Sequence, residues 1–246
     1  MLKFTQKVLL LTVLATLGGQ SSLQANPSIY LAQTFKPPGR GAPPKTADAG
    51  TRGCLVNAGE PQPLTALVPS EALALTTQEK PTLFWYMPEA KGKTVQFTLL
   101  DRHDETIIYE TEIGGLSQSG IVGIDLSQIA PTSEETSGLE VDRLYHWYMV
   151  IVCDPTDRTG DVIVDGWIER VQPSQTLQAQ LHNTAATDRA KIYAEAGIWH
   201  DALSAIAKQY YSGSANPAIA AQWETLLRSV KLDAFTNTPI LKMSQR

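Results

Sequence analysis

Residues 145–153, YHWYMVIVC, form the strongest strand pattern of the chain and decide its fold class. Tyr145, Trp147, Met149, Ile151 and Cys153 share one face of an extended strand. The alternate positions are largely apolar as well. A strand that is apolar on both faces belongs in the middle of a sheet or between two layers. We therefore expect this stretch to lie at the centre of a β-structured domain.

Short strand patterns lie on both sides of this stretch. Thr82 to Tyr86 is an apolar and aromatic run, and residues 95–99 alternate before a polar turn and a return through 106–111. Residues 121–126 and 161–171 supply two more patterns, and Gly166 predicts either a bulge or close packing against Trp167. About seven short strands at this spacing predict an antiparallel, immunoglobulin- or fibronectin-like β-sandwich. Tyr145, at the start of its strand, fits the tyrosine corner of such sandwiches.

Beyond Val171 the spacing of apolar residues becomes helical. It predicts four short helices, and Asn216-Pro217 forms the start of the last one. Tyr193, Gly197 and Ala202 have the relative spacing of a tetratricopeptide repeat, here as one degenerate copy. The predicted fold class is therefore β+α. We expect a sandwich over 54–172, a small repeat-like helical segment over 173–233 and a tail over 234–246.

The first 25 residues have the layout of a secretory signal peptide. Lys3 and Lys7 form a basic start before an apolar run that is too short to span a bilayer. We expect an exported protein, periplasmic or secreted, without a membrane span. Residues 26–53 are rich in proline and glycine and predict a flexible linker. The basic residues of this linker leave a second interpretation open, a contact with an anionic envelope polymer.

Cys54 and Cys153 are the only two cysteines. In an oxidising compartment they predict one disulfide, and two separately buried thiols remain the alternative. Two isolated cysteines without nearby histidines do not make a zinc site. The formal net charge of −5 disfavours nucleic acid as a partner. We predict neither a metal nor a cofactor.

Several ordered motifs resemble one known family. They are TRGC at 51–54, LTALVP at 64–69, PTLFWY at 81–86, CDPTDR at 153–158, GWI at 166–168 and YAEAGIWHDAL at 193–203. Together they resemble family 928 of the domains of unknown function, which consists mainly of exported cyanobacterial proteins. The resemblance runs from about Thr51 to about Leu232. It implies no activity, cofactor or catalytic residue.

Three aspartates, Asp154, Asp157 and Asp161, cluster in the loop between the two best strands. They lack the spacing of a calcium loop. We interpret Asp154 as the start of an Asx turn and expect Asp157 to pair with Arg158 or a neighbour. A glycosidase pair drawn from this loop is a weaker alternative, and the chain has no nucleophile-elbow motif of a serine hydrolase. Whether the protein is an enzyme stays open, and we favour a protein without catalytic activity.

Five tryptophans raise the question of a sugar-stacking surface. Trp147 and Trp223 are expected to fill cores. Trp199, at a turn between two helices, is the one candidate for exposure, and a core position is still favoured over a sugar-stacking surface. The four histidines, His103, His146, His182 and His200, share no metal-binding spacing and are expected to be exposed or hydrogen-bonded.

The leading functional hypothesis is a non-enzymatic exported recognition or adaptor module for an envelope or extracellular protein. Its candidate recognition residues are Asp154, Asp157, Arg158, Asp161, Trp167 and Trp199. The alternative is an envelope polysaccharide-binding or glycan-active protein that uses exposed tryptophans and the loop aspartates. A cleft that combines Trp167 or Trp199 with two of the aspartates would favour this alternative. A third hypothesis is a purely structural envelope component.

Overall fold

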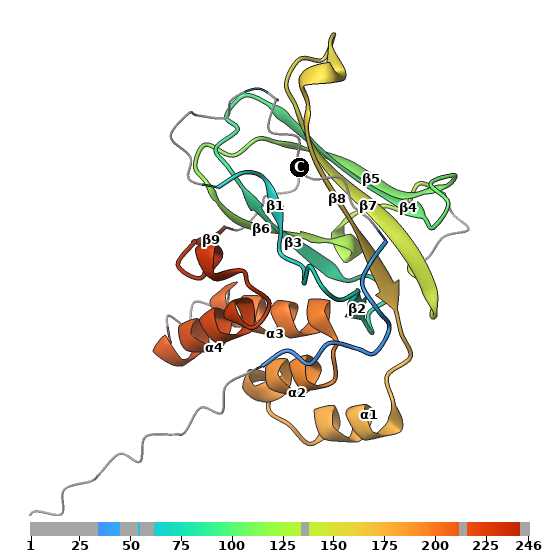
Figure 1. Cartoon of the computed structure of the whole chain (residues 1–246), viewed down its shortest axis with the longest axis vertical. Coiled ribbons are helices and arrows are strands. Elements are labelled where there is room, and N and C mark those ends of the chain that lie inside the picture. Colours follow the sequence, from blue (N-terminus) through green and yellow to red (C-terminus); the bar gives the residue numbers. More distant parts are fainter. Residues whose placement is uncertain (1–33, 45–53, 55–61, 134–137, 212–215, 242–246) are drawn as a thin grey trace, which may run out of the picture. The chain divides into compact units, whose positions relative to one another are not determined.

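The structure is a computed structural model that describes residues 34–44, 54, 62–133, 138–211 and 216–241. Its strands form two sheets (Figure 1). Sheet A has the order β1-β3-β6-β9 and sheet B the order β2-β8-β7-β4-β5. The strands are β1 Thr65–Ala66, β2 Ala74–Thr76, β3 Thr82–Met87, β4 Thr94–Asp101, β5 Ile107–Gly114, β6 Gly120–Asp125, β7 Arg143–Val152, β8 Val162–Arg170 and β9 Ile240–Leu241. The helices are α1 Gln175–His182, α2 Arg189–Glu195, α3 Trp199–Tyr211 and α4 Pro217–Arg228.

The two sheets enclose the first hydrophobic core. Trp85 of β3 and Trp147 of β7 meet in this core edge to face, with ring centroids 5.3 Å apart. Phe97 of β4 packs against Trp85 from the same core. The inward residues of β7 are the ones that the alternation of 145–153 places on one face. The prediction of a central strand is confirmed, because β7 lies between β8 and β4.

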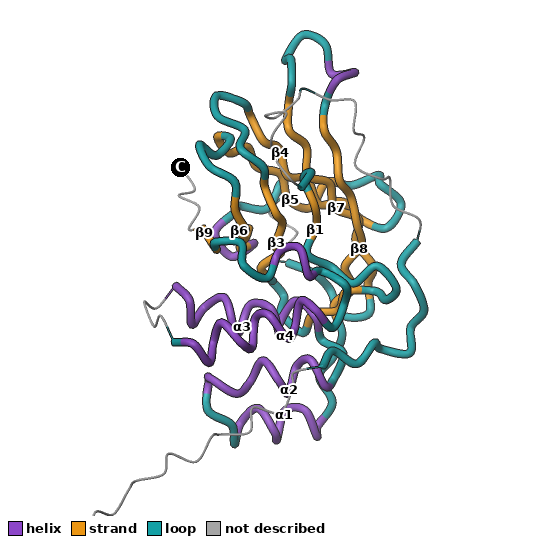
Figure 2. Tube along the Cα trace, turned by 60° about the vertical axis from the view of Figure 1, so that its left-hand side comes forward, coloured by secondary structure: helices purple, strands orange, loops and turns teal. Residues whose placement is uncertain are grey.

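A second core lies between sheet A and the helices. Phe84 and Tyr86 of β3 belong to it, together with Trp199 of α3 and Trp223 of α4. Figure 2 shows α3 and α4 alongside the strands of this sheet. Because β3 serves one core with its odd positions and the other with its even positions, Leu83 to Met87 is apolar throughout. The strand between two layers is therefore β3, whereas Tyr148 and Val150 of β7 are only half-buried.

The β7–β8 register explains Gly166. Trp147 lies opposite Gly166, and a Cβ at position 166 would come within 2.2 Å of the indole Cζ2 of Trp147. The prediction that Gly166 makes room for Trp167 is wrong. Neighbouring residues of a strand point to opposite faces, so the space is taken by Trp147 inside the core.

The β+α class is confirmed, but the sandwich is not purely antiparallel. β2 pairs with β8 in parallel, and β9 pairs with β6 in parallel. Both are short strands that long connections bring to the edge of a sheet, so no tight hairpin fixes an antiparallel direction. Tyr145 makes the contact expected of a tyrosine corner, since its hydroxyl accepts a hydrogen bond from the Glu140 backbone N–H at 2.9 Å.

Part of the expected flexible linker lies against the folded chain. Phe35 is only 4% exposed, and its ring meets Trp199 edge to face at 5.2 Å. The Lys36 N–H donates to the Ala194 carbonyl at 3.0 Å. Gly197, at φ +75°, allows this approach because a Cβ there would lie 2.8 Å from the Lys36 carbonyl oxygen. The apolar side chain of Phe35 thus anchors a stretch whose composition predicted a tether.

The expected tail also belongs to the fold as far as Leu241. Phe235 is buried against Tyr86, with ring centroids 5.1 Å apart, and β9 extends sheet A. The four predicted helices are present, and the Asn216 side chain caps α4 by accepting from the Ala218 N–H at 2.9 Å. Within the described residues, no helix combines the length and apolarity required to cross a bilayer. The predicted signal peptide, 1–25, lies outside these residues.

Candidate functional site

Two of the three loop aspartates accept hydrogen bonds from the threonine two positions later in the chain. Asp154 accepts hydrogen bonds from the N–H and the hydroxyl of Thr156 at 2.8 and 2.7 Å, which is the predicted Asx turn. Asp157 accepts from the N–H and hydroxyl of Thr159 at 3.0 and 2.6 Å. These hydrogen bonds, which favour the charged form, lower the pKa of both carboxyls.

The third aspartate of the loop is also engaged. Asp161 accepts from the Cys153 N–H at 2.9 Å and pairs with Arg158, so Arg158 does not pair with Asp157. Arg158 also donates to the Gln96 side chain at 2.8 Å. Among the described residues, no three acidic, histidine or cysteine side chains are arranged to hold a metal ion.

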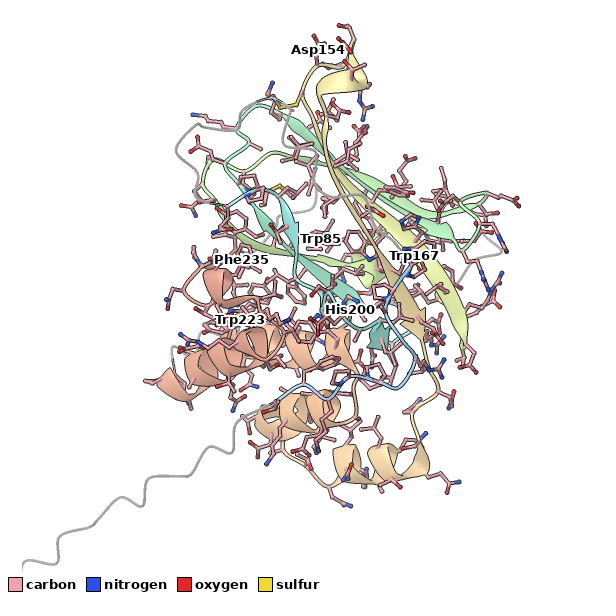
Figure 3. All side chains as sticks on the ribbon, viewed as in Figure 1. Trp85, Asp154, Trp167, His200, Trp223 and Phe235 are labelled. Carbon is pink, nitrogen blue, oxygen red and sulfur yellow. A yellow bond between two sulfur atoms is a disulfide. The ribbon has the colours of Figure 1, made fainter. Side chains whose placement is uncertain are left out.

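The structure separates the loop aspartates from the candidate tryptophans. Asp154 lies at the tip of the β7–β8 hairpin, and Trp167 lies well down β8 (Figure 3). Trp199 is fully buried, with its indole N–H donating to the Leu67 carbonyl at 2.7 Å. The favoured interpretation of Trp199 as a core residue is confirmed, and Phe35 packs against its ring. The cleft that would favour glycan chemistry is therefore not formed by these residues.

Trp167 lies in the wall of an apolar groove of about 320 Å³. The groove runs between β1, at the edge of sheet A, and the neighbouring stretch of β8. Its lining consists of prolines, small apolar residues and a few polar residues: Pro43, Pro63, Leu64, Thr65, Ala66, Val68, Pro69, Ser70, Ala72, Ala74, Val164, Asp165, Gly166, Trp167 and Leu232. The volume falls within the range of small-ligand pockets.

Behind this wall, on the outer face of sheet B, lies a polar cluster centred on His146. Its ring stacks flat on Trp167, with centroids 4.0 Å apart and an interplanar angle of 4°. Its Nε2 lies 2.7 Å from Asp165 Oδ2, and its Nδ1 lies 2.9 Å from Asp104 Oδ1. The Tyr148 hydroxyl completes the cluster, 3.0 Å from Nδ1 and 3.3 Å from Asp104 Oδ2.

The electrostatics of the cluster follow from burial and charge. Burial, with the negative charges of Asp104 and Asp165, raises the pKa of Tyr148 to about 12. Tyr148 is therefore a hydrogen-bond donor at neutral pH. Both nitrogens of His146 are occupied by groups of the cluster, Nε2 by Asp165 and Nδ1 by Asp104 and Tyr148. These contacts hold the members of the cluster in place.

A second buried histidine has the opposite surroundings. His200 of α3 is 1% exposed, and neither ring nitrogen has a hydrogen-bond partner. Complete burial lowers the pKa of His200 to about 3, so the ring is neutral at physiological pH. Its neighbour Asp201 accepts from the Thr76 hydroxyl at 2.6 Å and from the Thr77 N–H at 3.1 Å.

The cysteines lie as predicted. The Sγ atoms of Cys54 and Cys153 are 2.11 Å apart, at disulfide distance, and the pair joins positions 99 residues apart. The Cys54 N–H also donates to the Gly160 carbonyl at 3.3 Å. The pair therefore anchors Cys54 at the base of the β7–β8 hairpin loop.

A family model for a domain of unknown function, DUF928, matches residues 47–240. The chain belongs to this family. The match covers the two sheets, the four helices and the polar cluster, and it confirms the resemblance read from the ordered motifs. No curated protein and no solved structure matches the chain.

The residues at the centre of this DUF928 site were not singled out in the sequence, apart from Trp167. Asp104 and His146 are 42 positions apart, and Asp165 lies 19 positions beyond His146. One signal was present: His146 and Tyr148 are polar positions on the same face of an otherwise apolar strand. A buried histidine on such a strand requires hydrogen-bond partners. The hairpin register then places Asp165 opposite Tyr148.

Proposed function

We propose that the protein is an exported, non-enzymatic recognition module that binds an apolar segment of a partner protein in the groove walled by Trp167. The observation that carries this proposal is the chemistry of the groove. Among its described lining residues only Asp165 is ionisable, and that carboxylate is 3% exposed and bonded to His146. The remaining walls offer apolar surface and a flat indole, which suit aliphatic, aromatic or proline side chains.

Export and two fold analogies are further parts of this proposal. Export is supported by the signal-peptide layout of 1–25 and by the cysteine pair, since disulfides persist in oxidising compartments. An immunoglobulin- or fibronectin-like sandwich is supported by the tyrosine-corner contact of Tyr145. A tetratricopeptide-like origin of the α2–α3 pair rests on Tyr193, Gly197 and Ala202. These fold analogies add little about function by themselves.

The experiment is site-specific photocrosslinking in the native envelope and medium. A benzophenone amino acid replaces Ser70, which is exposed and lines the groove, and in a second protein it replaces Gln180, exposed on α1. We expect one protein to crosslink from Ser70 in near-stoichiometric amount and not from Gln180. Trp167→Ala should reduce this crosslink at least tenfold. Ile163→Ala is the matched control, because Ile163 is exposed on the same strand outside the groove.

Two results would overturn the proposal. Equal crosslinking from Ser70 and Gln180, or capture that survives Trp167→Ala, would exclude the groove as the recognition site. Retention of the protein on envelope polysaccharide, with no protein crosslinked, would move the function to the glycan alternative.

A further inference from the structure

The wall of the groove depends on a residue that does not line it. Trp167 is only partly buried, and its large flat contact on the face of sheet B is the ring of His146. Stacked rings at 4.0 Å fix the plane of both partners. Trp167 also packs against an apolar cluster that includes Leu75 and Leu177, so this cluster and the His146 ring together hold the groove wall.

Both nitrogens of the His146 ring have hydrogen-bond partners. A neutral imidazole carries one N–H, which can serve only one of two carboxylates. His146 faces a carboxylate oxygen at each nitrogen, at 2.7 and 2.9 Å. The Tyr148 hydroxyl, 3.0 Å from Nδ1, is a further partner of the ring and can donate to its lone pair. The imidazole is therefore held by Asp165 at Nε2 and by Asp104 and Tyr148 at Nδ1.

The chain builds the two carboxylates into place from different elements. Asp165 comes from β8, directly beside the groove. Asp104 comes from the β4–β5 turn, where it adopts φ +58°, a left-handed conformation that favours Asn and Asp. Asp101 fixes this turn by accepting from the N–H groups of Glu105 and Thr106 at 2.9 and 3.2 Å. The turn thus presents Asp104 to His146 through its own backbone geometry.

We propose that His146 is a positioning residue for the groove: Asp104, Tyr148 and Asp165 hold its ring, and the ring, stacked on Trp167, fixes the indole as the groove wall. The groups that contact the imidazole are Asp104 from the β4–β5 turn, Tyr148 from β7, and Asp165 and Trp167 from β8. Because the ring is held at both nitrogens, its plane is fixed, and the stacked indole keeps its position beside the groove.

This inference rests on the proposed function only for the use of the groove, and its test needs no ligand. The measurement is NMR of ¹⁵N-labelled protein at pH 7, reading the His146 ring nitrogens and the Trp167 indole N–H, assigned with His146→Gln and Trp167→Phe. In Asp104→Asn we expect the His146 Nδ1 signal and the Trp167 indole signal both to move, because Asn keeps the left-handed turn but removes the charge that faces the ring.

Asp142→Asn is the matched control, since Asp142 is a second aspartate at φ +58° and lies outside the cluster. It should leave both readouts unchanged. A Trp167 signal that does not respond to Asp104→Asn, or that moves equally in Asp142→Asn, would overturn the positioning role. If the NMR result holds while Ser70 crosslinks nothing, the positioning role stands and the recognition function fails.

Discussion

His146 and His200 are both buried, yet the chain treats them in opposite ways. His146, on the outer face of sheet B, has a carboxylate at each nitrogen and an indole against its ring. His200, in the helix-covered layer, has no hydrogen-bond partner at either nitrogen. The outer face of sheet B thus supports charge and hydrogen bonds at the edge of a groove. Burial keeps the His200 ring neutral at physiological pH, and the layer between sheet A and the helices contributes apolar packing.

The sharpest test of this difference compares two tryptophans. Trp223→Ala, in the core between α4 and sheet A, should lower the free energy of unfolding by about 3–5 kcal/mol, the cost of a large cavity. Trp167→Ala, on the partly exposed face, should cost less than about 2 kcal/mol. Chemical denaturation of both variants measures the two costs. Equal losses would contradict the assignment of the main packing to the helix-covered layer.

Acid should act on the same layer through His200. The folded pKa of about 3 lies below the unfolded value of about 6.5, so the unfolded chain binds an extra proton between these values. Stability from the neutral ring is complete above pH 6.5 and is lost as the pH falls towards 3. Lowering the pH from 7 to 4 should therefore reduce the unfolding free energy of the native protein through His200, and His200→Leu lacks this loss. The stability of His200→Leu relative to the native protein should rise by about 3 kcal/mol between pH 7 and pH 4.

His182→Gln, at the end of α1, serves as the control for acid denaturation and should follow the native pH profile. Burial raises the pKa of Asp201, which opposes the His200 effect, but this group is present in all three proteins. An unchanged pH dependence in His200→Leu would show that His200 is reached by protons in the folded state.

Asp201 provides the next smaller effect. Its carboxylate ties α3 to the turn after β2 through Thr76, Thr77 and Gln78. Asp201→Ala leaves buried donors without an acceptor and should cost about 2–3 kcal/mol. Asp188→Ala, at an exposed position without a capping hydrogen bond, should be close to neutral in the same denaturation experiment. A loss below 1 kcal/mol for Asp201→Ala would show that water replaces the carboxylate.

The smallest effect on stability is expected at Asp104. Its side chain is 43% exposed, so its charge interaction is screened by solvent. Asp104→Asn should change the unfolding free energy by less than about 1 kcal/mol. A loss as large as that of Asp201→Ala, measured in parallel, would mean that the outer face is as tightly coupled to folding as the helix-covered layer.

The sequence predicted the helices and strands of this fold better than it predicted which elements pack against one another. Period-2 and period-3.6 patterns depend on local burial, so the strand at 145–153 and the helix starting at Asn216 could be recognised directly. The position of β3 between two layers could not be recognised, because an apolar run does not show which elements cover each face of a strand. Phe35 and Phe235 were missed for a related reason: a single buried aromatic in a polar segment leaves no periodic trace.

The candidate site was predictable only in part. Trp167 was singled out as an aromatic on a strand, and Asp154 was correctly read as a turn residue. The Asp104–His146–Asp165 cluster depends on three elements meeting, and only the register of β7 with β8 and with β4 brings them together. The residue that covers Trp199 could not be predicted, because Phe35 is 164 positions earlier in the chain.

The most direct test of the contrast between the two layers is ¹⁵N NMR of the His200 ring in the native protein, followed from pH 8 to pH 5. We predict that His200 keeps a single ring proton throughout this range, because complete burial lowers its pKa to about 3. A His200 ring that gains its second proton within the range would contradict the contrast.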